Sequence, residues 1–213
     1  MDDFAAPKAV IARGLETDSL DYHVLGNAAQ AIKGIQGSVC ELGTRRGGSM
    51  KVIVDALLDN ADFGRDVLCV DPYGNIEYAG GENRAIRYDY TNDMRNESYA
   101  AIYQYAQGRP VNIVVLNLED TEFFNRFSDG YPFYNQYKRI SNTYALVFFD
   151  GPHDTPSLYK EIEFFYPRCP IGGMWVFDDL ALYPHQNIDE RLYDWGFDMI
   201  EATERKASYR RIR

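Results

Sequence analysis

Four residues in the second half of the chain have side chains that could bind a metal ion and move a proton. Asp150 ends one apolar run, and the adjacent acids Asp178 and Asp179 end the next. If the two runs are neighbouring parallel strands, about 4.8 Å apart, their terminal acids converge on one point. Three carboxylates make an oxygen-rich site that suits Mg²⁺, or else Mn²⁺ or Ca²⁺, better than zinc. The alternative is a solvated acidic rim, because acids at strand ends also form turns.

The fourth of these residues is His153, three positions after Asp150. We interpret it as a base, because it lies beside the acids and imidazole accepts a proton near neutral pH. His23 and His185 are interpreted as structural or surface residues. Asp178 and Asp179 would point to opposite faces of a continuing strand, so both can bind one ion only if the chain turns there.

A glycine-rich loop, Glu41-Leu42-Gly43-Thr44-Arg45-Arg46-Gly47-Gly48-Ser49, follows an earlier apolar run and opens a helical segment. Gly43 would permit a tight turn, and Gly47 and Gly48 would let the backbone approach a ligand. Asp71 ends the next apolar run, where an acid can accept hydrogen bonds from ribose hydroxyls. Ordinary turn glycines are the alternative interpretation.

This loop matches neither GxGxxG nor GxxxxGK[ST], the two common phosphate-binding patterns. It resembles motif I of class I S-adenosylmethionine (SAM) dependent methyltransferases, whose pattern is acid-x-Gly-x-x-x-Gly. SAM has a ribose but no phosphate, which agrees with Asp71 and a single glycine turn. Glu119 and Asp120 occupy the place of the adenine contacts, with a solvated turn as the alternative. The candidate cofactor-binding residues are Glu41, Gly43, Thr44, Gly47, Gly48, Ser49, Asp71, Glu119, Asp120 and Asp150.

Residues 30 to 182 together resemble the macrocin O-methyltransferase type of metal-dependent sugar methyltransferase. The resemblance rests on Glu41, Arg46-Gly47-Gly48-Ser49, Asp150-Gly151-Pro152-His153, Gly172-Gly173 and Asp178-Asp179. It implies that Asp150, Asp178 and Asp179 hold Mg²⁺ and that His153 is the base. It also implies methyl transfer from SAM to a hydroxyl of a sugar-bearing small molecule. The N-terminal segment of this chain is shorter than in that family. The resemblance therefore says less about the identity of the acceptor than about the methyl-transfer chemistry.

Positioning these residues requires a parallel sheet. Buried strands are indicated by short apolar runs at 38–43, 66–71, 111–118, 144–150 and 174–179, and helices by the segments 49–58, 94–105, 158–166 and 188–195. Strands alternating with helices predict a doubly wound, Rossmann-like α/β sheet with helices on both faces. The segments 196–202 and 207–213 are joined too closely for a crossover, so they add an antiparallel hairpin and make seven strands.

We expect one domain over residues 1–213, with residues 1–36 as an N-terminal helical cap. No repeat or linker divides the chain. The aromatic segment containing Tyr131, Phe133, Tyr134 and Tyr137 is either an acceptor wall or lid, or a helix packed on the sheet.

The net charge of -10 argues against a nucleic-acid partner. The acidic opening segment and the lack of any apolar run of about 18 residues predict a cytoplasmic protein without a membrane partner. The three cysteines are expected to be buried, reduced thiols. A basic cluster, Arg205, Lys206, Arg210, Arg211 and Arg213, is interpreted as a solvated terminal hairpin rather than an anion site.

Three other functions stay open at this point: an NAD-linked oxidoreductase, a non-catalytic SAM-binding module and a metal-independent methyltransferase. The acceptor is a small molecule whose reacting group is a sugar hydroxyl, a diol or a carboxylate. A homo-oligomer is possible.

Overall fold

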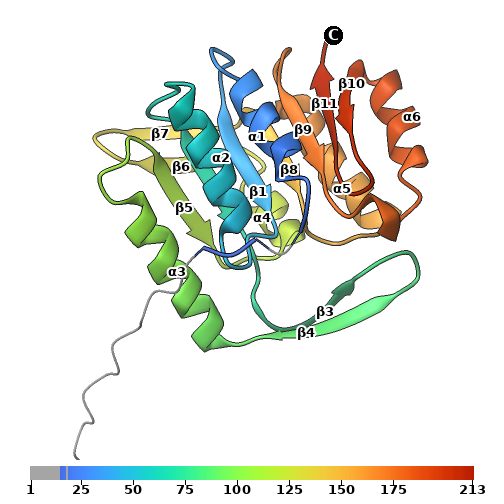
Figure 1. The fold of residues 1–213 in the computed structure, drawn as a ribbon, viewed down its shortest axis with the longest axis horizontal. Coiled ribbons are helices and arrows are strands. Elements are labelled where there is room, and N and C mark those ends of the chain that lie inside the picture. The colour runs from blue at the N-terminus through green and yellow to red at the C-terminus, as the bar shows by residue number, and fades with distance from the viewer. Residues whose placement is uncertain (1–14, 18) are drawn as a thin grey trace, which may run out of the picture.

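The computed structural model describes residues 15–17 and 19–213, and its centre is a seven-stranded sheet (Figure 1). The strands run in the order β10-β11-β9-β8-β1-β2-β5. Their bounds are Ser38–Leu42 (β1), Asp66–Val70 (β2), Asn112–Leu116 (β5), Tyr144–Phe149 (β8), Met174–Phe177 (β9), Phe197–Ala202 (β10) and Ala207–Arg211 (β11).

The strand directions confirm the prediction from the apolar runs. The pairs β1–β2, β2–β5, β1–β8 and β8–β9 are parallel, whereas β11 is antiparallel to both β9 and β10. The chain moves outward from β1 through β2 to β5 and then returns to place β8 on the other side of β1. The strand order therefore reverses between β1 and β8, where doubly wound sheets bind their ligands.

Helices cover both faces of the sheet, as predicted. On one face lie α1 (Tyr22–Ala31), α2 (Gly48–Asp59) and α3 (Asn92–Ala106), and on the other α4 (Asp120–Arg126), α5 (Thr155–Phe165) and α6 (Gln186–Asp194). Because two layers cover the sheet, the central strands are buried on both sides rather than on alternate residues. Two short 3₁₀ helices, η1 (Tyr166–Arg168) and η2 (Leu180–Leu182), complete the chain.

Helix α1 lies within the expected N-terminal helical cap, of which residues 1–14 and 18 lie outside the described residues. It packs into the core, because Val24, Leu25, Ala28 and Ala29 are buried against α2 and the sheet.

The sequence patterns missed two hairpins that stand apart from the main sheet. One pairs β3 (Gly74–Ala79) with β4 (Ala85–Tyr90), and the other pairs β6 (Tyr131–Tyr134) with β7 (Lys138–Ser141). The aromatic segment is therefore a β-hairpin and the predicted helix is wrong. Phe133 packs in the core, whereas the side chains of Tyr134 and Tyr137 are exposed.

Two composition-based expectations can be compared with the structure. Cys40, Cys69 and Cys169 are buried and free, as predicted. Within the part of the chain that the structure describes, every helix is too short or too polar to cross a bilayer.

Candidate active site

A cavity of about 490 Å³ lies at the carboxyl ends of β1, β2 and β8. Its wall combines the loop between β1 and α2, the residue that ends β2, the start of α4, the loop after β8 and parts of the β3–β4 hairpin. This is the edge at which the strand order reverses, the place where doubly wound sheets bind their ligands.

Gly43 lies where the loop after β1 meets the loop after β8. Its φ angle is +86°, and a Cβ atom at this position would lie 1.9 Å from the carbonyl oxygen of Asp150. The loops after β1 and β8 can therefore touch only because residue 43 has no side chain.

Most of the candidate cofactor residues line the cavity, namely Gly43, Thr44, Gly48, Ser49, Asp71, Glu119, Asp120 and Asp150. Glu41 and Gly47 do not. Gly48 also has a role that the sequence did not reveal, because a Cβ atom there would lie 2.1 Å from the carbonyl oxygen of Glu16. The segment before α1 thus crosses the glycine-rich loop, and Glu16 itself lines the cavity.

Asp71 is held rigidly at the end of β2. Its carboxylate accepts hydrogen bonds from the backbone N–H groups of Arg45 at 2.7 Å and Tyr73 at 2.8 Å. Burial raises the pKa of Asp71, and these hydrogen bonds offset only part of that effect. Each carboxylate oxygen has a second lone pair, so Asp71 can still accept a hydrogen bond from a ligand hydroxyl.

Glu41 lies behind the cavity wall and is fully buried. Burial raises its pKa to about 7, although the hydroxyls of Ser49 and Thr44 face the carboxyl group and lower the value in part. Neither oxygen has a hydrogen-bond partner of good geometry among the described residues. Because Thr44 and Ser49 line the cavity, they stand between Glu41 and any ligand.

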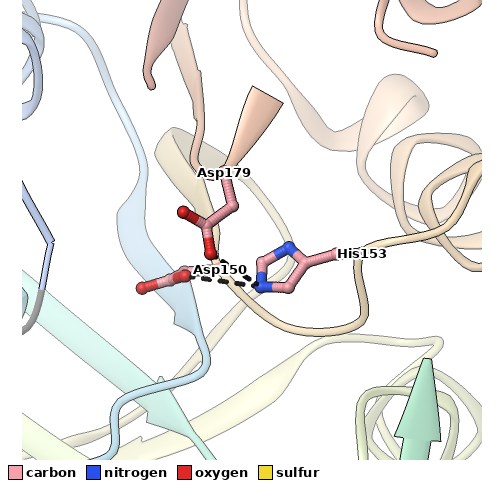
Figure 2. A group of neighbouring side chains, drawn as sticks. All are labelled: Asp150, His153 and Asp179. Carbon is pink, nitrogen blue, oxygen red and sulfur yellow. Dashed lines mark ion pairs between the residues drawn. The ribbon is translucent and has the colours of Figure 1, made fainter. Parts of the chain in front are cut away.

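At the other end of the cavity, Asp150, His153 and Asp179 point toward one another (Figure 2). Nε2 of His153 lies 3.6 Å from Oδ2 of Asp179 and 4.0 Å from Oδ1 of Asp150. The backbone N–H of His153 donates to the carbonyl oxygen of Ala79, 2.8 Å away, which ties this loop to the β3–β4 hairpin. Burial lowers the pKa of His153, although Asp179 and Asp178 oppose this shift, so the imidazole is neutral at pH 7 and able to accept a proton.

A comparison with protein families identifies the domain that contains this arrangement. Residues 40–180 match the family model described as "Methyltransferase domain". The chain belongs to this methyltransferase family. It is a SAM-dependent methyltransferase, and the NAD-linked alternative is set aside. No curated protein matches the sequence.

Solved structures share the fold of this methyltransferase. The O-methyltransferase NovP is 17% identical with a TM-score of 0.62, and the match covers 90% of this chain and 79% of NovP. The calicheamicin methyltransferase CalS11 is 15% identical with a TM-score of 0.56, covering 87% and 77%. The SAH-bound methyltransferase PaMTH1 of Podospora anserina is 12% identical with a TM-score of 0.50, covering 89% and 78%.

Asp178 does not join the other candidate metal ligands of the methyltransferase. The chain turns immediately after β9, where Asp179 has a φ angle of +51° and its N–H donates to Oδ1 of Asp178. The Asp178 carboxylate is 1% exposed and lies 2.7 Å from the ammonium group of Lys206. The two adjacent acids therefore face different partners, and only Asp179 faces His153.

The turn between β10 and β11 supplies the partners of both acids. Lys206 pairs with Asp178, and Arg205 forms an ion pair with Asp179. Lys206 is fully buried and also donates to the Ser19 hydroxyl and the Leu20 carbonyl oxygen, each at 2.7 Å. For Lys206 the interpretation as part of a solvated basic cluster is wrong, whereas the Arg205 side chain is 40% exposed. No sequence signal pointed to them, because the acids that they contact lie 26 and 28 positions away.

Proposed function

We propose that this methyltransferase transfers the methyl group of SAM to a hydroxyl oxygen of a small molecule, with the help of a divalent cation such as Mg²⁺. The observation that carries the proposal is a base between two carboxylates, at one end of a cavity whose other end is lined by the glycine-rich loop and Asp71. The similarity to NovP, an O-methyltransferase, and to CalS11, a TDP-rhamnose 3'-O-methyltransferase, supports oxygen as the acceptor atom and a sugar as one class of acceptor.

His153 would take the proton of the acceptor hydroxyl onto Nε2. The oxygen then forms a bond to the methyl carbon as the bond from that carbon to the SAM sulfur breaks, leaving neutral S-adenosylhomocysteine (SAH). Much of the acceleration comes from holding the oxygen, carbon and sulfur in line. The contact between Gly43 and Asp150 serves this purpose, because it fixes the two loops at either end of the cavity.

The chemistry of the donor set fits a hard divalent cation. Asp150 and Asp179 each offer a carboxylate oxygen, and these atoms lie within 4.8 Å of one another and of a His153 nitrogen. When bound, such a cation lowers the pKa of a hydroxyl that it contacts. Asp150 and Asp179 would hold it: Asp179 pairs with Arg205 through Oδ1 but presents Oδ2 toward His153, whereas the Asp178 carboxylate is buried against Lys206.

The test is calorimetric titration of SAH into the protein, followed by methyl-transfer assays on hydroxylated acceptors with EDTA and with added Mg²⁺. We expect micromolar SAH binding, and transfer that EDTA abolishes and Mg²⁺ restores. Absence of SAH binding would refute the cofactor assignment. Transfer that persists in EDTA would leave the cofactor in place and remove the cation from the proposal.

A pH dependence of SAH binding follows from Glu41. Below its pKa of about 7 the carboxyl is protonated, and above it the carboxylate favours the ammonium group of SAH. SAH affinity should therefore rise by up to about tenfold per pH unit between pH 5.5 and 7 and then level off. In Glu41→Gln the affinity should be lower at pH 7.5 and nearly independent of pH. Titration calorimetry across this range measures both effects.

Stability should respond in the opposite direction and serves as the control. The pKa of the Glu41 carboxyl is raised in the folded protein from its ordinary 4.5. Between pH 4.5 and 7 the unfolded chain therefore loses this proton while the folded protein keeps it, so the stability of the fold decreases as the pH rises. Glu41→Gln should therefore melt no lower than the wild type at pH 8. Glu122→Gln, on the exposed side of α4, should leave both measurements unchanged. A pH-independent wild-type affinity would contradict the assignment of Glu41.

A further inference from the structure

A ring of hydrogen bonds joins Asp71 to the glycine-rich loop. The N–H of Arg45 donates to Oδ2 of Asp71, and the N–H of Tyr73 donates to Oδ1. The Tyr73 hydroxyl donates to the carbonyl oxygen of Arg45, which completes the ring. The glycine-rich loop and the residues after β2 are therefore connected twice, once through the carboxylate of Asp71 and once through the phenol of Tyr73.

The backbone is strained at both residues that donate to this carboxylate. The φ angles of Arg45 and Tyr73 are +45° and +50°, a left-handed conformation that side chains of this size seldom adopt. Such conformations cost free energy and persist only where the surrounding contacts hold them. The two residues are 28 positions apart in the sequence, yet both contact the same side chain. This placement points to a role in holding Asp71 rather than to two unrelated turns.

A neighbouring strand fixes the turn that carries Tyr73. The side-chain amide of Asn117, the residue after β5, donates to the carbonyl oxygens of Asp71 and Pro72. The N–H of Asp71 donates to the carbonyl oxygen of Leu116 at 3.0 Å. The turn is therefore held from the β5 side, and the Tyr73 hydroxyl extends this support to the glycine-rich loop.

The Tyr73 side chain lies behind the cavity wall. It is 2% exposed, whereas Arg45 and Asp71 line the cavity. Burial, together with the nearby Asp71, raises the pKa of the Tyr73 hydroxyl, so the phenol keeps its proton and acts as a donor. Its ring lies edge-on to that of Tyr99 on α3, with the ring centroids 5.8 Å apart. Tyr73 can therefore affect a ligand only through the residues that it holds.

Recognition of a ribose depends on the direction of both Asp71 oxygens. Each oxygen already accepts one backbone hydrogen bond, so its remaining lone pair has a fixed direction. Two ribose hydroxyls can donate to these lone pairs together only if the carboxylate does not rotate. Rotation would break the contacts from Arg45 and Tyr73, and a shift of Arg45 would move the loop that lines the same cavity.

We propose that Tyr73 is a positioning residue for SAM, whose hydroxyl holds the glycine-rich loop against Asp71 so that the carboxylate binds both ribose hydroxyls. This inference rests on the proposed function, in which the glycine-rich loop and Asp71 line the end of the cavity that holds SAM. Without the Tyr73 hydroxyl, Arg45 loses a contact that offsets its left-handed conformation. The loop then relaxes away from the end of β2, and Asp71 loses its fixed direction.

The experiment uses titration calorimetry to compare SAH with its 2′,3′-dideoxy analogue, which lacks both ribose hydroxyls. Tyr73→Phe removes one oxygen atom and keeps the buried ring. We expect SAH affinity to fall by about tenfold in this variant, while the affinity for the analogue stays within about twofold of wild type. A purely structural defect would weaken the binding of both compounds equally.

Tyr99→Phe is the matched control. It makes the same chemical change in the ring that Tyr73 contacts. The Tyr99 hydroxyl oxygen is buried and has no hydrogen-bond partner among the described residues, so its removal breaks no such contact. This variant should bind SAH and the analogue as the wild type does.

A double-variant cycle with SAH alone keeps the test decisive if the analogue binds too weakly to measure or if Tyr73→Phe lowers the melting temperature. Asp71→Ala should weaken SAH binding, and adding Tyr73→Phe to it should cost less than about a further twofold, because no carboxylate is left to position. Unchanged SAH affinity in Tyr73→Phe, equal losses for SAH and the analogue, or additive losses in the cycle would each overturn the proposal. Failure of the proposed function is recognised separately, as absence of SAH binding to the wild type, and would remove this inference with it.

Discussion

Replacing His153 with glutamine should lower the rate of methyl transfer by about a hundredfold to ten-thousandfold, the range typical for loss of a general base. The imidazole lies between Asp150 and Asp179 and is held neutral by burial, so it is the group at this end of the cavity best placed to accept the hydroxyl proton. Glutamine keeps the backbone contact to Ala79 and a side chain of similar length, but it cannot take up a proton.

Single-turnover assays with saturating SAM measure this effect. SAH affinity and melting temperature should match those of the wild type, because His153 lies at the acceptor end of the cavity. The matched control is His23→Gln, since the His23 side chain is 57% exposed and pairs with Glu201 away from the cavity. A loss of less than about fivefold in His153→Gln would show that another group, or solvent, takes the proton.

The centre of the main sheet could be predicted because β1, β2, β8 and β9 are buried on both faces. Such strands appear as continuous apolar runs, and residues 66–70 and 144–149 contain little else. The β3–β4 and β6–β7 hairpins escaped prediction because much of their surface is exposed. Their residues mix glycine, charged and aromatic types, so a short stretch of alternation does not stand out from a loop.

The candidate site was predictable where a strand end fixes the position of a side chain. Asp71 and Asp150 directly follow β2 and β8, and both line the cavity. The direction of Asp178 was not predictable, because it depends on the left-handed turn at Asp179 and on a buried lysine in another hairpin. Short-range spacing carries no information about a partner 28 residues away.

Replacing Lys206 with methionine should lower the free energy of unfolding by about 3–5 kcal/mol, because it removes the partner of a buried carboxylate. The Asp178 side chain is 1% exposed, and without Lys206 its described side-chain partner is the hydroxyl of Ser19 at 3.2 Å. Urea unfolding at pH 7 measures the loss. Arg210→Met changes an exposed cation on the same strand and should alter stability by no more than about 0.5 kcal/mol.

The double variant Lys206→Met/Asp178→Asn should recover most of that stability, because no unpaired charge then stays buried. It also separates two roles for Asp178. If this carboxylate only balances Lys206, as its burial and ion pair indicate, the double variant should retain methyl transfer and Mg²⁺ affinity within a few-fold of wild type. If Asp178 turns to bind the cation, as the macrocin O-methyltransferase pattern implies, both quantities should fall by orders of magnitude in a protein that remains folded. The geometry around β9 favours retention of methyl transfer and Mg²⁺ affinity in the double variant. The turn after β9 directs the Asp179 side chain toward His153 and the Asp178 side chain toward Lys206.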